Sequence, residues 1–490
     1  MARGFCFPGP PFPVGRCAKV QCRRALPPLA LAGREGRRAM RHDRMRQEHR
    51  YDAAIAHLLA GRTRPAEVGL RAVVAVNPRS APAHYHLGLA LRGERKWKAA
   101  AQAFRSALAL DPAHARAEAS LALMLLQTTS ATAAEPHARR AAVADPGDPL
   151  ILAALGNILR YLGRLTEARE AFDAALKLAP DHVDARFGRG FLSLLEGDYA
   201  SGLIDYEFRE SRTDGADPGF APQWRGEDIR GRSLLAYGEQ GLGDGLQFLR
   251  FLPPLVARGV QVTVMAPGPL TALARASLAG VRVLEPGDRP SFDVCCPLPS
   301  LPLYCGARPE ALPARGGYLS VPPGRVAAWK ARLGDSADMT VALAWAGNPD
   351  HTNDHNRSMT PADLAPLLQV PGVRWISVQK GPAAADLPRR LGVLDLGGEL
   401  KDFADTAAVM TLADLVVSVD SAPCHLAGAL GRPVWTMIPF APDWRWGLSG
   451  TDSAWYGSMR LYRQDQLEAG WTGAVEAAAR DLAALAAARA

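Results

Sequence analysis

The first half of the chain repeats one pattern of small and bulky apolar residues every 34 positions. The period is marked by Pro78, Pro112, Pro146 and Pro180. Small residues recur at the eighth place of each unit (Ala54, Gly88, Ala122, Gly156, Gly190) and at the twentieth (Ala66, Ala100, Ala134, Ala168, Gly202). Bulky residues recur at the twenty-fourth place as Leu70, Phe104, Phe172 and Tyr206, with Ala138 as the exception. Proline ends a helix and small residues let two helices cross closely, so the pattern predicts stacked helix pairs.

This pattern resembles the tetratricopeptide repeat. Four full units fill residues 47–182, and a degenerate fifth reaches about residue 212. The resemblance implies an α-helical repeat solenoid over 47–212, whose concave face binds an extended peptide or a partner subunit. A generic helical bundle is the simpler alternative, but four prolines at one spacing argue against it.

After residue 231 short apolar runs alternate with helical segments, which predicts parallel, doubly wound sheets. The expected strands are Leu234–Gly238, Gln261–Ala266, Val281–Glu285, Asp293–Leu298, Val341–Gly347, Val373–Gln379, Val393–Gly397, Leu415–Asp420 and Val434–Pro439. A break near 313–340, with one short helix at Arg325–Leu333, divides them into two sheets. We therefore expect a turn-rich linker at 213–231 and two facing Rossmann-like halves, at 232–325 and at 326–490, the second with a terminal helix.

Charge is concentrated at the start of the chain. Residues 1–50 contain twelve basic and three acidic residues, a net charge of +9, whereas the other residues carry 45 basic and 46 acidic groups. A folded part of net charge −1 argues against nucleic-acid binding. We predict that 1–46 is a disordered basic tail, with Met40 or Met45 as alternative translation starts. No run of ~18 apolar residues is present, so we expect no membrane span. The cysteines after the tail lack paired CxxC spacing, so we expect reduced thiols and a cytoplasmic location.

Candidate chemistry lies in the loops after the strands, where doubly wound sheets bind ligands. Asp244 follows the first strand in a glycine-rich turn, and its alternative role is to cap the next helix. Asp420, Ser421, Ala422 and His425 follow a later strand, where Pro423 suits a first helical turn. Helix amides exposed there favour an anion. The alternative is a capping serine and a histidine with only structural partners.

Three further segments follow strands of the second half. Asn348 and Arg357 come after its first strand, Lys380 comes after the next, and the aromatic and cationic loop Pro439–Trp446 could equally be packing. His351 and His355 have the spacing of a helical metal site, but their segment has the composition of a loop, so no metal site is expected.

Together these residues, in this order, resemble family 9 glycosyltransferases, the group that includes the lipopolysaccharide heptosyltransferases, over about 232–465. The resemblance implies two facing halves of the GT-B type and a nucleotide-diphosphate sugar as donor substrate. It makes Asp244 the catalytic base, Asp420, Ser421, Ala422 and His425 the donor segment, and Arg357 the cation on the donor phosphates. The chain has Ser for Thr, Ala for Gly and Arg for Lys in these motifs.

The order of repeats and transferase also looks like the protein O-linked N-acetylglucosamine transferases, although their Gly-Gly-Thr-Thr-Thr donor run is missing. We therefore expect an inverting, metal-independent glycosyltransferase without a cofactor. Its donor site would comprise Asn348, Arg357, Lys380, Asp420, Ser421, Ala422 and His425, and its repeats would present an acceptor protein or glycan. The alternative is a non-catalytic adaptor with a degenerate sugar-nucleotide fold.

Overall fold

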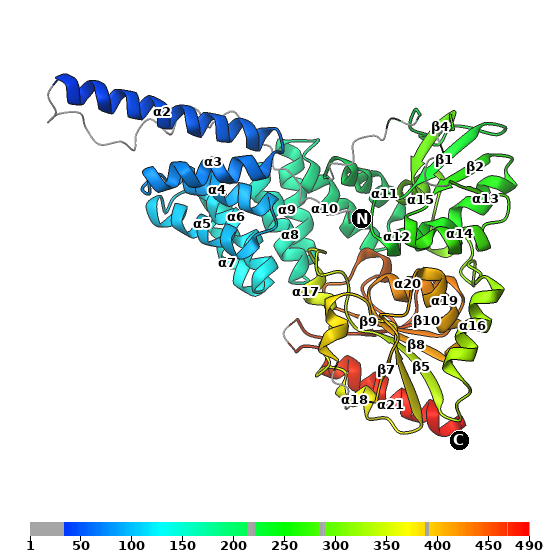
Figure 1. Ribbon diagram of the computed structural model, residues 1–490. Coiled ribbons are helices and arrows are strands. Elements are labelled where there is room, and N and C mark those ends of the chain that lie inside the picture. Colours follow the sequence, from blue (N-terminus) through cyan, green and yellow to red (C-terminus); the bar gives the residue numbers. More distant parts are fainter. Residues whose placement is uncertain are drawn as a thin grey trace. The chain divides into compact units, whose positions relative to one another are not determined.

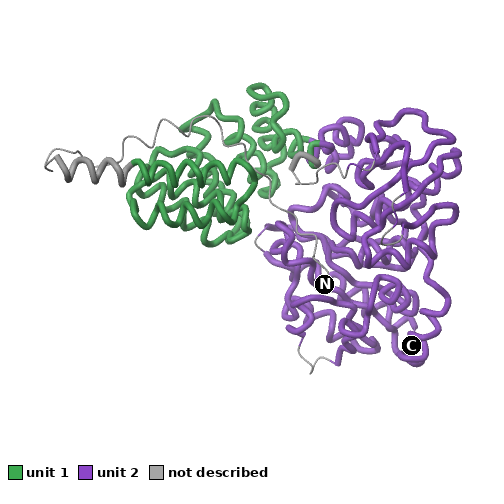
Figure 2. Tube along the Cα trace, turned by 45° about the horizontal axis from the view of Figure 1, so that its top comes forward, with its two compact units in different colours: residues 1–189, 208–214 green, residues 190–207, 215–490 purple. Residues whose placement is uncertain are grey.

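The computed structural model describes residues 34–212, 219, 221–284, 288, 290–387, 392–467 and 469–489. It divides into two compact units, the residues up to 189 with 208–214, and 190–207 with 215–490 (Figure 2). Most of the predicted tail, and residues 213–218 and 220 of the predicted linker, lie outside the described residues.

The prediction of disorder is wrong for residues 34–46. Helix α2 spans Arg34–Leu59 and includes them. The stretch contains no proline, and Arg, Met, Gln and Glu are good helix formers, so helix propensity prevails over the lack of apolar periodicity.

The first unit contains the predicted stack of helix pairs. Its helices are α3 (Thr63–Val76), α4 (Ala81–Gly93), α5 (Trp97–Leu110), α6 (Ala115–Thr128), α7 (Ala131–Ala144), α8 (Pro149–Tyr161) and α9 (Leu165–Leu178), and α10 (Val183–Leu195) begins in it. The second helix of each repeat ends two residues before a periodic proline, as predicted. The end of α10 and helix α11 (Tyr199–Tyr206) group with the second unit.

The recurrent small residues lie where helices approach closely, which confirms their predicted role. A Cβ atom at Gly88 would lie 2.5 Å from the ring of Phe104, and one at Gly156 would lie 2.8 Å from the ring of Phe172. Both phenylalanines are buried. Each ring therefore fills the space that the missing side chain leaves.

The second unit contains two parallel sheets (Figure 1). The first has the order β3-β2-β1-β4, and the second has the order β10-β9-β8-β5-β6-β7. The strands are β1 (Ser233–Tyr237), β2 (Gln261–Met265), β3 (Arg282–Val283), β4 (Val294–Pro297), β5 (Met339–Ala344), β6 (Val373–Ser377), β7 (Leu394–Asp395), β8 (Leu415–Val419), β9 (Val434–Ile438) and β10 (Met459–Arg463). All nine predicted strands are confirmed, while the edge strand β10 was not predicted.

Helices connect and cover these strands. They are α12 (Leu242–Phe248), α13 (Leu252–Ala257), α14 (Thr271–Ser277), α15 (Leu301–Tyr304), α16 (Pro323–Leu333), α17 (Asp354–Arg357), α18 (Ala365–Leu368), α19 (Phe403–Leu412), α20 (Ala422–Ala429) and α21 (Thr472–Arg489). A 3-10 turn, η9 (Trp444–Trp446), follows β9. In the second half, residues of β5, β8, β9 and the terminal helix α21 form one apolar core.

The strand order of both halves reverses at a defined place. The chain moves outward from β1 through β2 to β3 and returns to the other side of β1 as β4; it does the same from β5 through β7 and then to β8. Doubly wound sheets bind ligands beyond the carboxyl ends of the strands at such a switch point. The loops after β1 and β4, and after β5 and β8, are therefore where a site is expected.

Candidate functional site

Most of the residues predicted from the sequence lie at these switch points. Asp244 follows β1, Arg357 follows β5, and the segment from Asp420 to His425 follows β8. Helix α12 of the first half packs against α20 of the second, so the loops after β1 and β8 meet (Figure 1).

Asp244 is the third residue of helix α12, and its N-cap is Gly241. Asp244 is therefore not the N-cap residue, as the alternative interpretation had it. Its side chain nevertheless accepts a hydrogen bond from a backbone N–H at the start of the helix. Its Oδ2 accepts a hydrogen bond of 3.0 Å from the Gly241 N–H, and its Oδ1 accepts one from Arg445 Nη2. The Asp244 side chain is 22% exposed.

Arg445 joins the two halves. It lies in the turn η9 of the second half, and its guanidinium donates to the Asp244 carboxylate and to Gln247 Oε1, both on α12. Nη1 donates to Asp443 Oδ1 at 2.8 Å. Burial alone would lower the pKa of Arg445, but the carboxylates of Asp443 and Asp244 raise that pKa well above its ordinary value. Arg445 is thus a permanent cation beside the predicted base.

Helix α20 begins at Ala422, as predicted, and Ser421 occupies its N-cap position. The Ser421 side chain makes no capping hydrogen bond, and its hydroxyl donates to the Val419 carbonyl at 3.3 Å. Among the first three residues of α20, Pro423 has no N–H and the Cys424 N–H donates to the Ser421 carbonyl at 3.0 Å, which leaves the Ala422 N–H for a ligand.

His425 is buried on α20 against aromatic rings. Its Nδ1 lies 3.0 Å from the Tyr456 hydroxyl, and its ring stacks on Trp446 at a centroid distance of 5.3 Å. Burial, followed by the charges of Arg445, Arg250 and Arg357, lowers the pKa of His425 well below its ordinary value. The imidazole is neutral at pH 7, so it can offer a hydrogen bond to an anion but not a charge.

Asp420 and Arg357 lie next to each other. Arg357 Nη1 donates to the Asp420 carbonyl at 3.0 Å, and its Nε donates to Asp354 Oδ1 at 3.2 Å. The Asp420 side chain is buried, and burial together with the nearby Asp443 carboxylate raises its pKa to about 6. Arg357 and Arg445 act in the opposite direction.

Asn348 and Lys380 are not brought to this cluster by any contact among the described residues. Exposed Asn348 accepts from the Asp350 N–H at 3.1 Å, which is a local loop bond. Lys380 Nζ donates to the Leu400 carbonyl. Their roles in donor binding stay predictions.

Three side chains of the loop after β8 could in principle hold a cation. Ligand atoms of Asp420, Cys424 and His425 lie within 4.8 Å of one another. Burial raises the pKa of the Cys424 thiol, which opposes the thiolate that a metal needs. The guanidinium groups of Arg357 and Arg445 add positive charge around the cluster. The carboxylates of Asp420 and Asp443 lie among these guanidinium groups, so positive and negative charges are balanced here, and the protonated Cys424 thiol is what argues against a bound metal.

The sequence indicated the loop Pro439–Trp446 as a segment but not the individual role of Arg445 within it, and it did not single out Gln247 or Arg250. Arg250 is buried and donates from Nη1 to the Trp455 carbonyl at 2.6 Å and from Nη2 to the Tyr318 hydroxyl at 3.2 Å. The sequence does contain a signal for both arginines. Arg250 interrupts an apolar segment, and Arg445 lies between Trp444 and Trp446. Charged residues in such surroundings stay buried only when they are hydrogen-bonded, so they mark an interface or a site.

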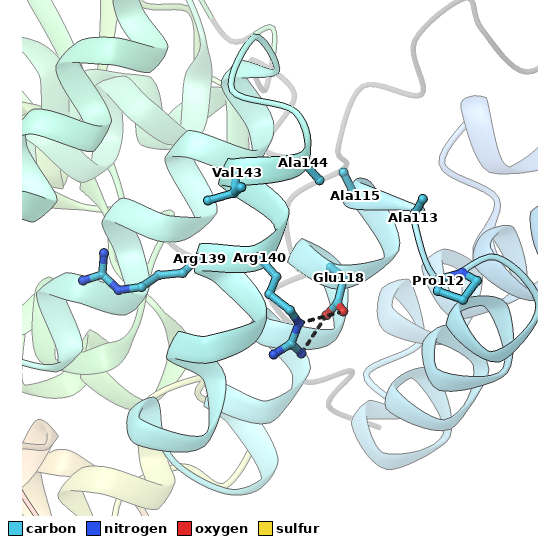
Figure 3. Close-up of a pocket in the computed structure, with 8 residues that line it drawn as sticks. All are labelled: Pro112, Ala113, Ala115, Glu118, Arg139, Arg140, Val143 and Ala144. Atoms are coloured by element: carbon cyan, nitrogen blue, oxygen red, sulfur yellow. Dashed lines mark hydrogen bonds and ion pairs between the residues drawn. The ribbon is translucent and has the colours of Figure 1, made fainter.

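The repeat unit has a hollow of its own, of about 410 Å³. Figure 3 shows the side chains that line it, from the loop after α5 and from helices α6 and α7. Arg140 Nε donates to Glu118 Oε1 at 3.2 Å beside the largely exposed Val143. This mixed apolar and charged lining does not identify a ligand.

Two family models match the chain. The tetratricopeptide repeat model matches residues 51–112, 85–149 and 153–210. The model of glycosyltransferase family 9 (heptosyltransferase) matches residues 384–447, which include Asp420, His425 and Arg445. The chain combines tetratricopeptide repeats with a segment similar to glycosyltransferase family 9. The two resemblances are confirmed over these residues, while the rest of the predicted range 232–465, with Asp244 and Arg357, lies outside the family 9 match.

The chain is also similar to individual proteins, which say less about its function than the family models do. Protein FlbA of Caulobacter vibrioides is 29% identical over 426 residues, covering 71% of this chain and 69% of FlbA. Among solved structures, MamA MSR-1 C2 is 25% identical with a TM-score of 0.28 and covers 34% of this chain and 97% of its own. YrrB, a TPR protein with an unusual peptide-binding site, is 20% identical with a TM-score of 0.26. The match covers 33% of this chain and 83% of the YrrB chain. In the described part of the chain, no helix is both long and apolar enough to cross a membrane.

Proposed function

We propose that the protein is an inverting glycosyltransferase that moves a sugar from a nucleotide-diphosphate donor to an acceptor hydroxyl. The observation that carries this proposal is the placement of the candidate residues. Asp244, Arg357 and the Asp420–His425 segment follow the strands that flank the switch points of two parallel sheets, and the last segment lies within the stretch similar to family 9.

The second half would bind the donor. Arg357 supplies a cation, the start of α20 supplies the Ala422 N–H, and neutral His425 supplies a hydrogen bond. These groups can take up the charge that develops on the leaving diphosphate. These groups provide the neutralisation that Mg²⁺ would otherwise supply, so the proposed reaction needs no metal. The nearby carboxylates of Asp420 and Asp443 are balanced by the guanidinium groups of Arg357 and Arg445.

The first half would supply the base. Asp244 lies at the carboxyl end of β1, and Gly243 beside it lets α12 approach His425 closely, since a Cβ atom there would lie 2.9 Å from the His425 ring. This brings the carboxylate near the donor loops, where it could remove the proton of an acceptor hydroxyl.

We further propose that the repeats bind the acceptor or a partner and that the protein acts in the cytoplasm.

The competing function is a non-catalytic adaptor. One observation favours it, because both carboxylate oxygens of Asp244 already have partners, Gly241 and Arg445. A purely structural Asp244 would leave the second half as a binding module.

The experiment that separates these functions is the Asp244→Asn variant. Asparagine has the same shape but only one acceptor oxygen, so it keeps the bond from Gly241 or the bond from Arg445 and turns its NH2 toward the other donor. Neither bond belongs to the proposed donor site, so donor binding should be retained, and thermal unfolding of the variant checks that the fold is retained as well. A general base contributes about 10²–10⁴-fold to the rate, so transfer should fall by that factor. Donor affinity is measured by calorimetry over a panel of nucleotide sugars, and transfer is measured with labelled donor, all in EDTA.

The matched control is Asp402→Asn. Asp402 caps α19 by accepting from the Asp405 N–H at 3.0 Å, so it shares the helix-start chemistry of Asp244 without following β1 or β8. Transfer by Asp402→Asn should remain near that of the wild type. Normal turnover by Asp244→Asn contradicts the base, and loss of donor binding in EDTA contradicts metal independence.

A further inference from the structure

Arg445 contacts both halves of the second unit through one rigid group. Its Nη2 donates to Asp244 Oδ1 and its Nε to Gln247 Oε1, and these two residues are three apart on α12, so they share one helix face. Its Nη1 donates to Asp443 in its own half. A single guanidinium thus links the predicted base to the loop that follows β9.

The surroundings of Arg445 fix its orientation. The side chain is 7% exposed. The guanidinium carbon lies 4.6 Å from the ring centroid of Trp444 and 5.4 Å from that of Phe248. Trp444 in turn contacts Tyr199 and Tyr206 of α11, each at a centroid distance of 5.7 Å. Aromatic contacts from three elements therefore hold the planar fork in place.

Arg445 in turn orients the side chains of its two partners on α12, Gln247 and Asp244. Gln247 is fully buried, and its amide Nε2 has no hydrogen-bond partner among the described residues, so Arg445 is what orients that amide. Asp244 has one oxygen on the Gly241 N–H and the other on Arg445. Two bonds to different oxygens define the plane of the carboxylate.

We propose that Arg445 is a positioning residue for transfer, which holds the Asp244 carboxylate in the orientation that receives the acceptor proton. This inference rests on the proposed function. Because Arg445 belongs to the half that would bind the donor, the base reaches its working orientation only when the two halves are joined. Arg445 acts through Asp244 and does not bind the donor.

The test uses Arg445→Lys in the full chain. Lysine keeps the charge that balances Asp244 and Asp443, so the fold is retained, but a single ammonium cannot reproduce the planar fork. Misplacement of a reacting group by about 1 Å can cost roughly 100-fold in rate. We expect kcat to fall by about that factor, with donor affinity by calorimetry unchanged.

The control is Arg332→Lys. Arg332 on α16 places the same planar fork on a carboxylate, since its Nε donates to Glu399 Oε2 at 2.9 Å and its Nη2 donates to Glu399 Oε1 at 2.7 Å. Its kcat should stay within about twofold of the wild type, because the change breaks an equivalent fork while Asp244 keeps its partner.

A double variant separates positioning from a general structural role. When Asp244→Asn has already removed the base, Arg445→Lys should cost no further rate, because coupled residues are non-additive. Additive losses, a normal kcat in Arg445→Lys, or weakened donor binding in that variant would each overturn the inference. Any of these results leaves the proposed function standing, whereas a wild-type chain that neither binds nor transfers a sugar overturns both.

Discussion

Asp420 shows how burial can set the chemistry of one residue. Its carboxyl group is buried near Asp443 and two guanidinium groups, and its pKa is raised to about 6. The folded protein therefore binds the Asp420 proton more tightly than the unfolded chain, where the pKa of an aspartate has its ordinary value of 3.8. The stability that this protonation contributes is complete below about pH 4 and is lost as the pH rises through about 6.

Asp420→Asn should remove this pH dependence. We expect the variant to gain stability relative to the wild type between pH 4 and pH 7, by an amount on the order of 2 kcal/mol. Urea unfolding of both proteins at a series of pH values measures it. A difference that stays constant with pH would show that Asp420 is ionised in the folded state throughout this range.

The candidate residues differ in how far the sequence could place them. Asp244, Arg357, Asp420 and His425 follow strands, and the strand pattern determines where such loops lie. Arg445 is 201 residues from its partner Asp244. Nothing in local periodicity encodes that pairing, because it depends on how two separately formed halves pack. Lys380 follows a strand as well, but its ammonium donates to the backbone carbonyl of Leu400. That contact also depends on tertiary packing, which local periodicity does not encode.

Among the elements, the close packing of α12 on α20 depends on Gly243. A Cβ atom at this position would lie 2.9 Å from Cδ2 of His425 and 3.6 Å from the Cα atom of Ala422. The His425 ring cannot easily move aside, since Trp446 stacks on it and Tyr456 bonds to it.

Gly243→Ala should therefore destabilise the second unit, by about 1–3 kcal/mol, despite the better helix propensity of alanine. Chemical denaturation followed by tryptophan fluorescence measures the loss. Gly324→Ala is the matched control, because it lies in the first turn of α16 with open space around its Cβ position. It should be neutral or slightly stabilising. Equal stability of the two variants would mean that α12 and α20 can move apart without a loss in the free energy of unfolding.

The elements themselves were largely predictable, and the exceptions have physical reasons. The repeat period locates each helix of the stack, and apolar runs locate the strands that are covered on both faces. Strand β10, at the edge of its sheet, reads Met-Arg-Leu-Tyr-Arg, so two arginines interrupt the continuous apolar run that its neighbours have. The start of α2 has helix propensity without a periodic apolar face.

At the scale of the whole molecule, the last repeat helix belongs to the second unit. Tyr199 and Tyr206 of α11 contact Trp444, and Tyr199 also stacks on Trp455 at 6.1 Å. Both tryptophans are nearly fully buried. Removing α11 would expose these rings to water.

A chain that begins at residue 183 should accordingly fold, whereas one that begins at residue 208 should be less stable by about 3 kcal/mol or more, as for loss of a large buried aromatic. Thermal unfolding and near-ultraviolet circular dichroism of the two fragments compare them. Identical transitions would show that α11 is dispensable for the second unit.

The switch-point topology also orders the events of synthesis. The repeat helices α3 to α9 pack mainly on their chain neighbours, so these repeats can form as they leave the ribosome. Strand β5, in contrast, pairs with β8, and Val341 meets Leu415 only after 74 more residues have been made. At about 5–20 residues per second the nascent chain carries an unpaired apolar strand edge for several seconds. This interval is when the chain most needs protection from aggregation, and it ends once the segment holding Asp420 has emerged.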